Sequence, residues 1–381
     1  MNIIPITKPS FNTQDENYLL DAFRSGFASG DGPECRLFEK EICNYLKVKH
    51  CFFTTSCTAA LDLAFMVKKF PAGSKVLVPN FTFTSTALAP LLNNLQVVLV
   101  DVNPKNGNID FNDAERKVTK DTVAISPVDY AGIPIEIEKM IAFAKKYSLY
   151  VVHDAAQSFG AEFKGKKIGT FADATCFSFH GTKNLVVGEG GALVTNNDKL
   201  AASILIARDK GTDKHTFIAD PKKKGFYEYV AKGNSYVQSN FLAALGRSQL
   251  QKYPSFLQRR KQIAKRYTDA FSKCKLIKTP YVTKGAQSNW HLYYLLVPPA
   301  WRFPLIEKVR GYGVTANIHY SPLHRNEYYK EAAYNALEKF PHTELFFERL
   351  VRLPMYPGLS DADVNQVISA VLSSISELSN K

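Results

Sequence analysis

Short apolar segments alternate with segments of helical spacing through the first half of the chain. The apolar segments, which we expect to be strands, cover residues 50–55, 75–78, 96–101, 122–126 and 149–154. The segments of helical spacing include residues 56–67 and 136–147 and a stretch that begins at residue 85. Strands that are apolar at nearly every position are typical of a parallel sheet covered on both faces by helices. The alternation therefore predicts an α/β fold with a mostly parallel sheet.

The C-terminal part of the chain has a different pattern. We expect helices at 240–250, 254–274, 304–311, 343–352 and 361–378, and strands at 292–297 and 315–320. Ser360 precedes the last helix and Asp363 lies in its first turn, as in a capping box. The pattern predicts two domains: residues 1–250, with an N-terminal arm and a large domain, and residues 251–381, a smaller α+β domain.

Composition narrows the classes of protein to which the chain can belong. Of the 381 residues, 45% are hydrophobic and 22% are charged, which is ordinary for a globular protein, and no apolar run is long enough to span a bilayer. The net charge of +13 is spread along the chain, and its densest groups, at 222–224 and 259–261, lack a nucleic-acid-binding module. We therefore expect neither nucleic acid nor a membrane as a partner. The six cysteines include no CxxC pair and no Cys/His cluster, which predicts no metal site and a cytoplasmic location.

The most distinctive local sequence lies at residues 175–195. An apolar, strand-like segment that contains Ser178 leads to Lys183, and a glycine-rich turn at 188–191 precedes a second strand. A lysine between two strands is partly removed from water, which lowers the pKa of its amine and makes it a nucleophile near neutral pH. The alternative is an ordinary surface lysine before a hairpin.

Other polar and aromatic residues occur at strand ends and at a helix start. Ser56 and Thr58 begin a helix, where free N–H groups and hydroxyls can bind a phosphate; a plain N-cap is the alternative. Phe81, Asp154 and Gln157 follow expected parallel strands, at the edge where such sheets bind ligands.

Pyridoxal phosphate (PLP) requires this combination of groups. Its phosphate needs a helix N-terminus with hydroxyls, and its ring needs an aromatic face. Its pyridinium nitrogen needs a carboxylate, and its aldehyde needs a lysine. The order of these groups along the chain indicates a PLP site around Lys183.

The same residues carry a resemblance to a known family. The chain resembles the DegT/DnrJ/EryC1/StrS sugar aminotransferases, which are PLP-dependent enzymes of fold type I (aspartate aminotransferase-like). Within this family it is most similar to the dTDP-4-amino-4,6-dideoxygalactose transaminases. The resemblance covers essentially the whole chain and is carried by residues 55–61, 79–86, 152–157, 176–183, 188–191, 209–212, 235–236, 318–324 and 352–355.

The resemblance implies a role for each matching residue. Lys183 would form the Schiff base, Asp154 would pair with the pyridine nitrogen, and Gln157 would contact the ring hydroxyl. The other cofactor contacts implied are stacking by Phe81 and phosphate binding by Thr58, Ala59, Ser178 and, from the second subunit of a homodimer, Ser235. The same resemblance suggests that His319, Tyr320 and His324 lie near the sugar nucleotide.

A few further residues have open roles at this stage. His180 would orient the site or merely pack beside it. His153 stands where an acidic residue is common in the family, and tuning and packing are equal alternatives. Arg208 and Lys210 would meet the diphosphate or lie solvated on the surface.

The implied reaction is amino transfer from L-glutamate to the C4 ketone of a nucleotide-linked sugar. The expected substrate is dTDP-4-keto-6-deoxy-D-glucose and the product dTDP-4-amino-4,6-dideoxy-D-galactose, for O-antigen or enterobacterial common antigen. The alternatives are a C3-specific aminotransferase, a noncatalytic relative and a 3-dehydratase, which would have histidine in place of Lys183. A thiol hydrolase that uses Cys57 or Cys176 with His180 is an alternative from another class.

Overall fold

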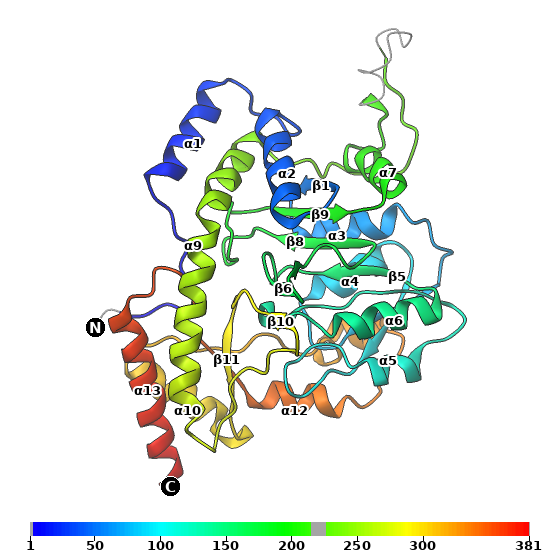
Figure 1. Cartoon of the computed structure of the whole chain (residues 1–381). Helices are drawn as coiled ribbons and strands as arrows, with labels where there is room; N and C mark the ends of the chain where they lie inside the picture. Colours follow the sequence, from blue (N-terminus) through cyan, green and yellow to red (C-terminus); the bar gives the residue numbers. More distant parts are fainter. Residues whose placement is uncertain (1–2, 215–225, 381) are drawn as a thin grey trace.

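A computed structural model describes residues 3–214 and 226–380 of the chain (Figure 1). At its centre is a seven-stranded sheet in the order β1-β9-β8-β5-β4-β2-β3. Its strands are β1 (His50–Thr54), β2 (Lys75–Pro79), β3 (Gln96–Val100), β4 (Thr122–Ile125), β5 (Tyr150–Asp154), β8 (Ala174–Ser178) and β9 (Gly191–Thr195). Within this sheet β9 pairs antiparallel with both neighbours, and all other pairs are parallel. The predicted α/β fold with a mostly parallel sheet is confirmed.

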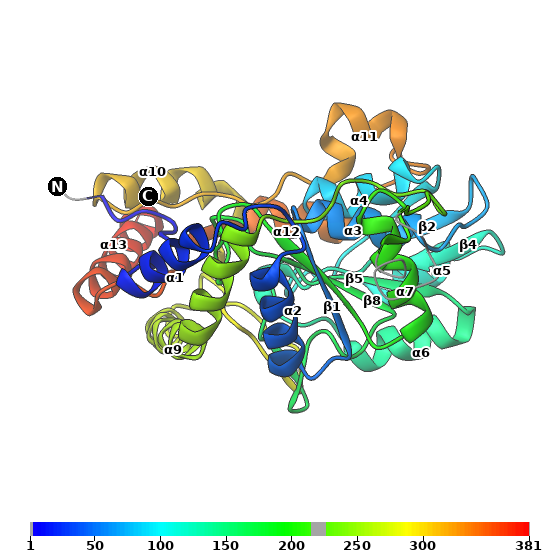
Figure 2. The ribbon, with the colours of Figure 1, turned by 90° about the horizontal axis from the view of Figure 1, so that it is seen from above.

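Helices cover both faces of the sheet because successive strand residues point to opposite sides. One face packs on α2 (Pro33–Leu46), α5 (Phe111–Lys117) and α6 (Ile137–Tyr147). The other face packs on α3 (Cys57–Met66), α4 (Thr84–Leu92) and α7 (Asp198–Arg208). In β2, for example, Leu77 belongs to the first layer and Val76 and Val78 to the second. Figure 2 shows these helices from above.

A long helix, α9 (Asn240–Phe271), links the two ends of the molecule. In Figure 1 it runs from α1 (Thr13–Arg24) and α2 down to α13 (Asp361–Ser379). We expected two helices, at 240–250 and 254–274, but the helix continues through Pro254. A proline removes one backbone hydrogen bond, and here both halves of the helix are held by packing. Ala243 contributes to the core of the sheet, and Tyr267 to the C-terminal core.

The C-terminal region builds a separate apolar core. The core is formed by α10 (Arg302–Gly311), α13, the second half of α9 and a two-stranded sheet of β11 (Tyr293–Leu296) and β12 (Leu350–Leu353). The remaining strands and α-helices of the described residues are β6 (Glu162–Phe163), β7 (Lys166–Lys167), β10 (Ala286–Gln287), α11 (Glu327–Ala332) and α12 (Pro341–Arg349). We propose to keep the division at residue 250, which falls inside α9, as the boundary between a large and a small domain.

The strand expected at 315–320 is wrong. This segment forms isolated bridges at Val314 and Asn317 and then leaves β12. Its departure brings Tyr320 against the large domain, where its hydroxyl accepts a hydrogen bond from Gln157. The expected capping box of α13 is present, with the Asp363 N–H donating to Ser360 Oγ.

Two expectations from the composition concern the basic residues and a membrane-spanning segment. The lysines at 222–224 lie outside the described residues. Within residues 3–214 and 226–380, no helix has the length and apolar character needed to cross a membrane.

A buried arginine anchors the strand that leads into α3. Arg208 is 2% exposed and forms ion pairs with Glu39 and with Asp31, the latter at 3.2 Å. Glu39 also accepts the N–H of Phe53 in β1, and Arg208 donates to the Phe53 carbonyl at 3.3 Å. Arg208 is therefore a structural residue and does not meet a diphosphate. Lys210 pairs with Asp209.

Replacing Arg208 with methionine should destabilise the protein by about 3–5 kcal/mol, because it removes the cation that pairs with the Glu39 carboxylate and one of the two arginines beside Asp31. Urea unfolding followed by circular dichroism measures the loss. The control is Arg36→Met, since Arg36 has a 68% exposed side chain and lies 3.8 Å from Asp31. That change should cost less than about 1 kcal/mol. Equal, small losses in both variants would contradict the anchoring role.

Candidate active site

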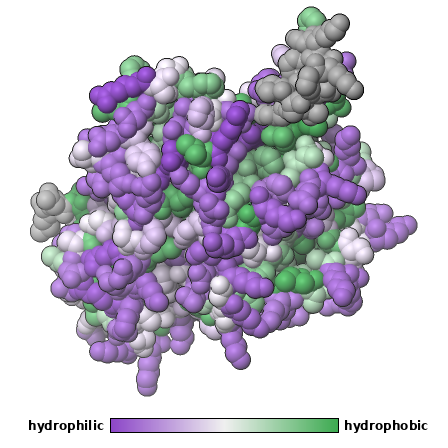
Figure 3. Space-filling view, turned by 45° about the horizontal axis from the view of Figure 1, so that its top comes forward, coloured by the Kyte–Doolittle hydropathy of each residue, from purple (hydrophilic) through white to green (hydrophobic). Residues whose placement is uncertain are grey.

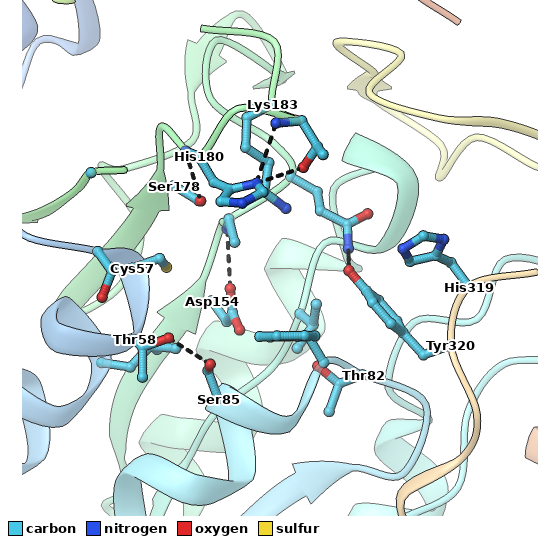
Figure 4. Close-up of a pocket in the computed structure, with 18 of the residues that line it drawn as sticks. Cys57, Thr58, Thr82, Ser85, Asp154, Ser178, His180, Lys183, His319 and Tyr320 are labelled. Carbon is cyan, nitrogen blue, oxygen red and sulfur yellow. Dashed lines mark hydrogen bonds between the residues drawn. The ribbon is translucent and has the colours of Figure 1, made fainter. Parts of the chain in front are cut away.

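Most of the residues that the sequence predicted for the site line one cavity, which we call the lysine cavity. It has a volume of about 370 Å³ and lies at the carboxyl ends of β5 and β8 (Figure 4). The large domain supplies most of its wall, and the segment after Asn317 closes it. The wall includes Ser56, Cys57, Thr58, Thr82, Phe83, Ser85, Asp154, Gln157, Ser178, His180, Thr182, Lys183, His319 and Tyr320.

Lys183 lies in the turn between β8 and β9. Its N–H donates to the carbonyl of His180 at 2.8 Å, which fixes the backbone of the turn. Burial lowers the pKa of the Lys183 amine, and the positive charge of Arg352 lowers it further, while Cys57 and Asp154 oppose this effect. The neutral amine, which is the nucleophilic form, is thereby favoured.

Asp154 is the last residue of β5 and is 4% exposed. Thr86 Oγ1 donates to its Oδ2 at 2.6 Å, and the N–H of Ala156 donates to its Oδ1 at 3.1 Å. Burial raises the pKa of this carboxyl, against the effect of these hydrogen bonds. A buried carboxylate with few positive partners is suited to pair with a protonated ring nitrogen.

Another part of the cavity wall lies at the start of α3 and has a helix N-terminus and hydroxyls, which are the groups that bind anions. Ser56 Oγ caps the helix by accepting the N–H of Ala59 at 3.0 Å, and the hydroxyls of Thr58 and Ser85 are 2.6 Å apart. Thr58, Ser85 and Ser178 line the cavity, whereas Ala59 does not. The expected phosphate residues Thr58 and Ser178 are therefore brought together, and Ala59 contributes an N–H that is already capped.

The turn at 188–191 shapes this part of the cavity. Gly188 has a φ of +95°, which a side chain would strain. A Cβ on Gly191 would lie 2.4 Å from the backbone N of Cys57 and 2.4 Å from the carbonyl carbon of Ser56. Glycine is thus required for β9 to pass against the start of α3.

The expected stacking residue, Phe81, does not reach the cavity. Its side chain is fully buried, with its ring centroid 5.1 Å from those of Tyr130 and Phe346. Phe83, two residues later at the N-cap of α4, is 51% exposed and lines the cavity. The expectation that Phe81 stacks on the ring is therefore wrong, and Phe83 is the phenylalanine of this run that lines the cavity. The Phe-x-Phe spacing offered both rings, and only the packing distinguishes them.

Gln157, predicted to contact the cofactor ring, lines the lysine cavity together with two of the three residues predicted to lie near the sugar, His319 and Tyr320. Gln157 lines the cavity, where its Oε1 accepts the N–H of Ala131 at 2.8 Å and its Nε2 donates to the Tyr320 hydroxyl at 3.2 Å. His319 also lines it, and burial, with Arg352, lowers the pKa of His319 to about 4. Figure 4 shows His319 and Tyr320 side by side on one wall of the cavity.

Other predicted residues lie outside the lysine cavity. His324 does not line it; its Nδ1 is 2.7 Å from Asn80 Nδ2 and its Nε2 is 2.8 Å from Glu344. Ser235 is exposed and pairs with Asp209 in an isolated bridge. The local sequence could not place either residue, because both depend on contacts between distant segments.

Two histidines and two cysteines lie in or near the lysine cavity. His180 lines the cavity, with its Nδ1 2.9 Å from Thr182 Oγ1. His153 is buried beneath it, with its Nε2 3.0 Å from Asp129 Oδ1. Burial raises the pKa of the Cys57 and Cys176 thiols well above the usual range, which disfavours the thiolate that a thiol hydrolase needs.

The arrangement fits pyridoxal phosphate on structural grounds. A lysine of lowered pKa, a buried carboxylate and a helix N-terminus with hydroxyls face one cavity from separate elements. Sequence reasoning missed Phe83, Ser85 and Thr86, although the hydroxyl-rich run 82–86 follows a strand end and was a usable signal.

Comparisons with known proteins agree with this geometry. Residues 9–372 match the model of the DegT/DnrJ/EryC1/StrS aminotransferase family. The spore coat polysaccharide biosynthesis protein SpsC of Bacillus subtilis is 33% identical over 97% of this chain and 96% of its own length.

Solved structures are similar over nearly the whole chain. Helicobacter pylori PseC, an aminotransferase involved in pseudoaminic acid biosynthesis, is 27% identical, with a TM-score of 0.91 over 99% of this chain and all of its own. The PLP form of the sugar aminotransferase Spr1654 of Streptococcus pneumoniae is 26% identical, with a TM-score of 0.90 over 98% of this chain and 99% of its own.

The predicted fold type I architecture, cofactor and enzyme class are confirmed by these findings. The protein is a transaminase that uses pyridoxal phosphate. The chain belongs to the DegT/DnrJ/EryC1/StrS aminotransferase family.

Proposed function

We propose that this enzyme transfers an amino group from L-glutamate to the C4 ketone of a nucleotide-linked sugar in the cytoplasm. The proposed substrate is dTDP-4-keto-6-deoxy-D-glucose and the product dTDP-4-amino-4,6-dideoxy-D-galactose, a precursor of a surface polysaccharide such as O-antigen or enterobacterial common antigen. The choice of nucleotide and of C4 is supported by the sequence resemblance to the transaminases that form this product. SpsC and PseC, by their names, serve polysaccharide and pseudoaminic acid synthesis, which supports a sugar acceptor.

The observation that carries the proposal is the space beside Lys183. The lysine cavity adjoins a second cavity of about 460 Å³, which we call the tyrosine cavity. Thr82, Phe83 and Tyr320 line both, and Tyr328 and Tyr329 line the second. Two adjoining cavities, one reactive and one aromatic, fit a substrate that has a reacting sugar joined to a large nucleotide.

The residues that hold the cofactor have distinct tasks in the proposed mechanism. The N-terminus of α3, with Thr58 and Ser178, binds the phosphate. Asp154, oriented by Thr86, holds a proton at the ring nitrogen, and Phe83 covers one face of the ring. Bound pyridoxal phosphate supplies a carbonyl that carries the amino group and a ring that accepts the electrons of a deprotonated carbon.

Lys183 moves the protons in both halves of the proposed reaction. With the cofactor bound, its Nζ would take the proton from the α-carbon of glutamate. In the second half the same Nζ would deliver a proton to C4 of the sugar. The lowered pKa of Lys183 favours the unprotonated amine, which is the form that accepts a proton.

We also propose that the enzyme is a homodimer with its site at the subunit interface. Phe226 is 82% exposed and Tyr229 is 72% exposed on the segment that leads to Ser235. Figure 3 shows apolar surface, in green, beside the grey residues near this segment. Because Ser235 lies outside its own lysine cavity, it would reach a cofactor phosphate only in a second copy.

We expect the active enzyme to sediment at twice the mass of one chain, since two copies would form each site. An active monomer would exclude the shared site.

Replacing Lys183 with alanine should reduce turnover by at least about 10³-fold, because the residue that moves the protons and the point of cofactor attachment are lost together. Amino transfer is measured as 2-oxoglutarate formed from glutamate. Lys210→Ala is the control, because Lys210 lies outside the cavity and pairs with Asp209. It should leave turnover within about twofold. Turnover close to wild type in Lys183→Ala would contradict the assignment of Lys183 as the residue that binds the cofactor and moves the protons.

Replacing Phe83 with alanine should weaken the affinity for pyridoxal phosphate by about 2–10-fold, since an aromatic contact contributes about 0.5–1.5 kcal/mol. The dissociation constant is obtained from cofactor absorbance during titration of the apoenzyme. Phe81→Leu is the control: it should lower the thermal midpoint, because Phe81 is a core residue, and leave cofactor affinity unchanged. The reverse result would restore Phe81 as the stacking ring.

The sugar assignment is tested with a panel of nucleotide-linked 3-keto and 4-keto 6-deoxy sugars. The holoenzyme is incubated with glutamate and each sugar, and the product is identified by mass spectrometry and NMR. We expect the dTDP-4-keto sugar to react fastest and the amine to be at C4. An amine at C3 would replace the proposal with the C3-specific alternative, and no product from any sugar would favour a noncatalytic relative.

A further inference from the structure

His291 joins the small domain to the turn that carries Lys183. It lies shortly before β11 and is 5% exposed. Its Nδ1 is 3.1 Å from Oδ1 of Asn184, the buried residue that follows Lys183. The two side chains are 107 positions apart in the sequence. This contact therefore ties the lysine turn to a distant part of the chain.

The partners of Asn184 fix the orientation of its side-chain amide. Its Nδ2 donates to the carbonyl of Asn289 at 3.0 Å. A carbonyl oxygen only accepts, so this atom of Asn184 must be the nitrogen and the other must be the oxygen. The oxygen faces Nδ1 of His291, and an amide oxygen also only accepts. Nδ1 of His291 must therefore carry a proton.

Asn289 extends this network to a second cavity residue. Its Nδ2 donates to the carbonyls of Gln157 and Phe159, at 2.9 Å and 3.0 Å. Its Oδ1 accepts the N–H of His291 at 3.1 Å. Gly132 leaves room for the amide, because a Cβ there would lie 1.8 Å from Asn289 Oδ1. The network thus reaches the backbone of Gln157, whose side chain lines the lysine cavity.

The ring of His291 is uncharged near neutral pH. Burial lowers its pKa well below the usual value, and the positive charges of Lys183, Arg352 and Arg260 and the nearby His319 lower it further. A neutral imidazole has one N–H and one lone pair, so the lone pair is at Nε2. His291 also lines a small cavity of about 110 Å³ together with Lys183. It can therefore act through Nδ1 on Asn184 or through Nε2 in this cavity.

The residues on either side of Lys183 favour the first of these routes. Thr182 is hydrogen-bonded to His180, within the same turn. Asn184, in contrast, bonds to two residues of the small domain. A reacting group that is misplaced by about 1 Å can lose about 100-fold in rate. The bonds of Asn184 thus hold the lysine turn where its chemistry needs it.

We propose that His291 is a positioning residue for Lys183 and that it acts by donating its Nδ1–H to Asn184. The inference rests on the proposed role of Lys183 in binding the cofactor and moving protons. The hydrogen bond fixes the backbone that follows the lysine, so that the amine stays directed into the lysine cavity. His291 itself transfers no proton.

Two substitutions of His291 separate the roles of its two nitrogens. Asparagine places an N–H donor near the position of Nδ1, whereas glutamine places its amide near the position of Nε2. Both remove the ring, so the loss of packing is similar. Turnover should stay within about threefold of wild type in His291→Asn and fall by about 10–100-fold in His291→Gln.

A second readout does not require turnover. The apoenzyme of each variant is mixed with pyridoxal phosphate, and the growth of the visible absorption band is timed. This rate depends on the placement of Lys183, and it should be about tenfold lower or more in His291→Gln and nearly unchanged in His291→Asn. Equal losses in both variants, no loss in either, or a loss confined to His291→Asn would each overturn the inference.

Asn184→Ala tests whether His291 acts through Asn184. Adding His291→Gln to Asn184→Ala should change turnover by less than about twofold, because the two substitutions remove the same interaction. A further loss as large as the one that His291→Gln causes alone would show independent action and would overturn the inference.

The tautomer of His291 is tested in the unmodified enzyme, which keeps the inference testable even if the variants do not fold. NMR of protein labelled with ¹⁵N in histidine should show His291 protonated at Nδ1 and untitrated between about pH 6 and about pH 9. A proton at Nε2 instead would overturn the inference. Failure of every sugar in the panel would refute the proposed substrate and would leave the absorption and NMR measurements unaffected.

Discussion

The contact between β9 and the start of α3 is the constraint on which the site depends. Gly191 lies so close to the backbone of Ser56 and Cys57 that any side chain would force them apart. This contact holds the β8–β9 turn, which carries Lys183, against the helix N-terminus that offers Thr58. The nucleophile and the anion site are therefore fixed relative to each other by backbone packing, and the glycine-rich turn has a structural role.

Burial gives the polar groups of the site their chemical properties. Removal from water lowers the pKa of Lys183 and raises that of Asp154, so each is prepared for the partner that the cofactor provides. Arg352 adds a second buried cation near Lys183 and favours its neutral form. The cost of burying these groups is offset by the large apolar layers on both faces of the sheet.

Sequence reasoning was most successful where local pattern decides the structure. Apolar runs indicated the strands of the parallel sheet, and the residues at their ends, Asp154 and Gln157, line the cavity. It failed where long-range packing decides. Phe81 and Phe83 differ in sequence by position alone, and the burial of Phe81 depends on Phe346 from the small domain. The segment 315–320 has strand composition, yet its contacts with the large domain keep it from pairing as a strand.

The burial of Arg352 shows the same limit. Its sequence neighbours indicate a strand, and nothing local indicates that one edge of its guanidinium lacks a partner. The small cavity beside Arg352 is lined by residues 6–7, 182–183, 291–292 and 317–320 as well as by Arg352, and these segments are far apart in sequence. Such a site becomes visible only when the hydrogen bonds of each buried polar group are followed in three dimensions.

The central claim is that the cofactor is attached to Lys183, and covalent trapping tests it most directly. Borohydride reduction of the purified holoenzyme, followed by proteolysis and mass spectrometry, should place the pyridoxyl group on the peptide that contains Lys183. Pyridoxyl on a different lysine, or no modified lysine in a protein that retains amino-transfer activity, would contradict the account.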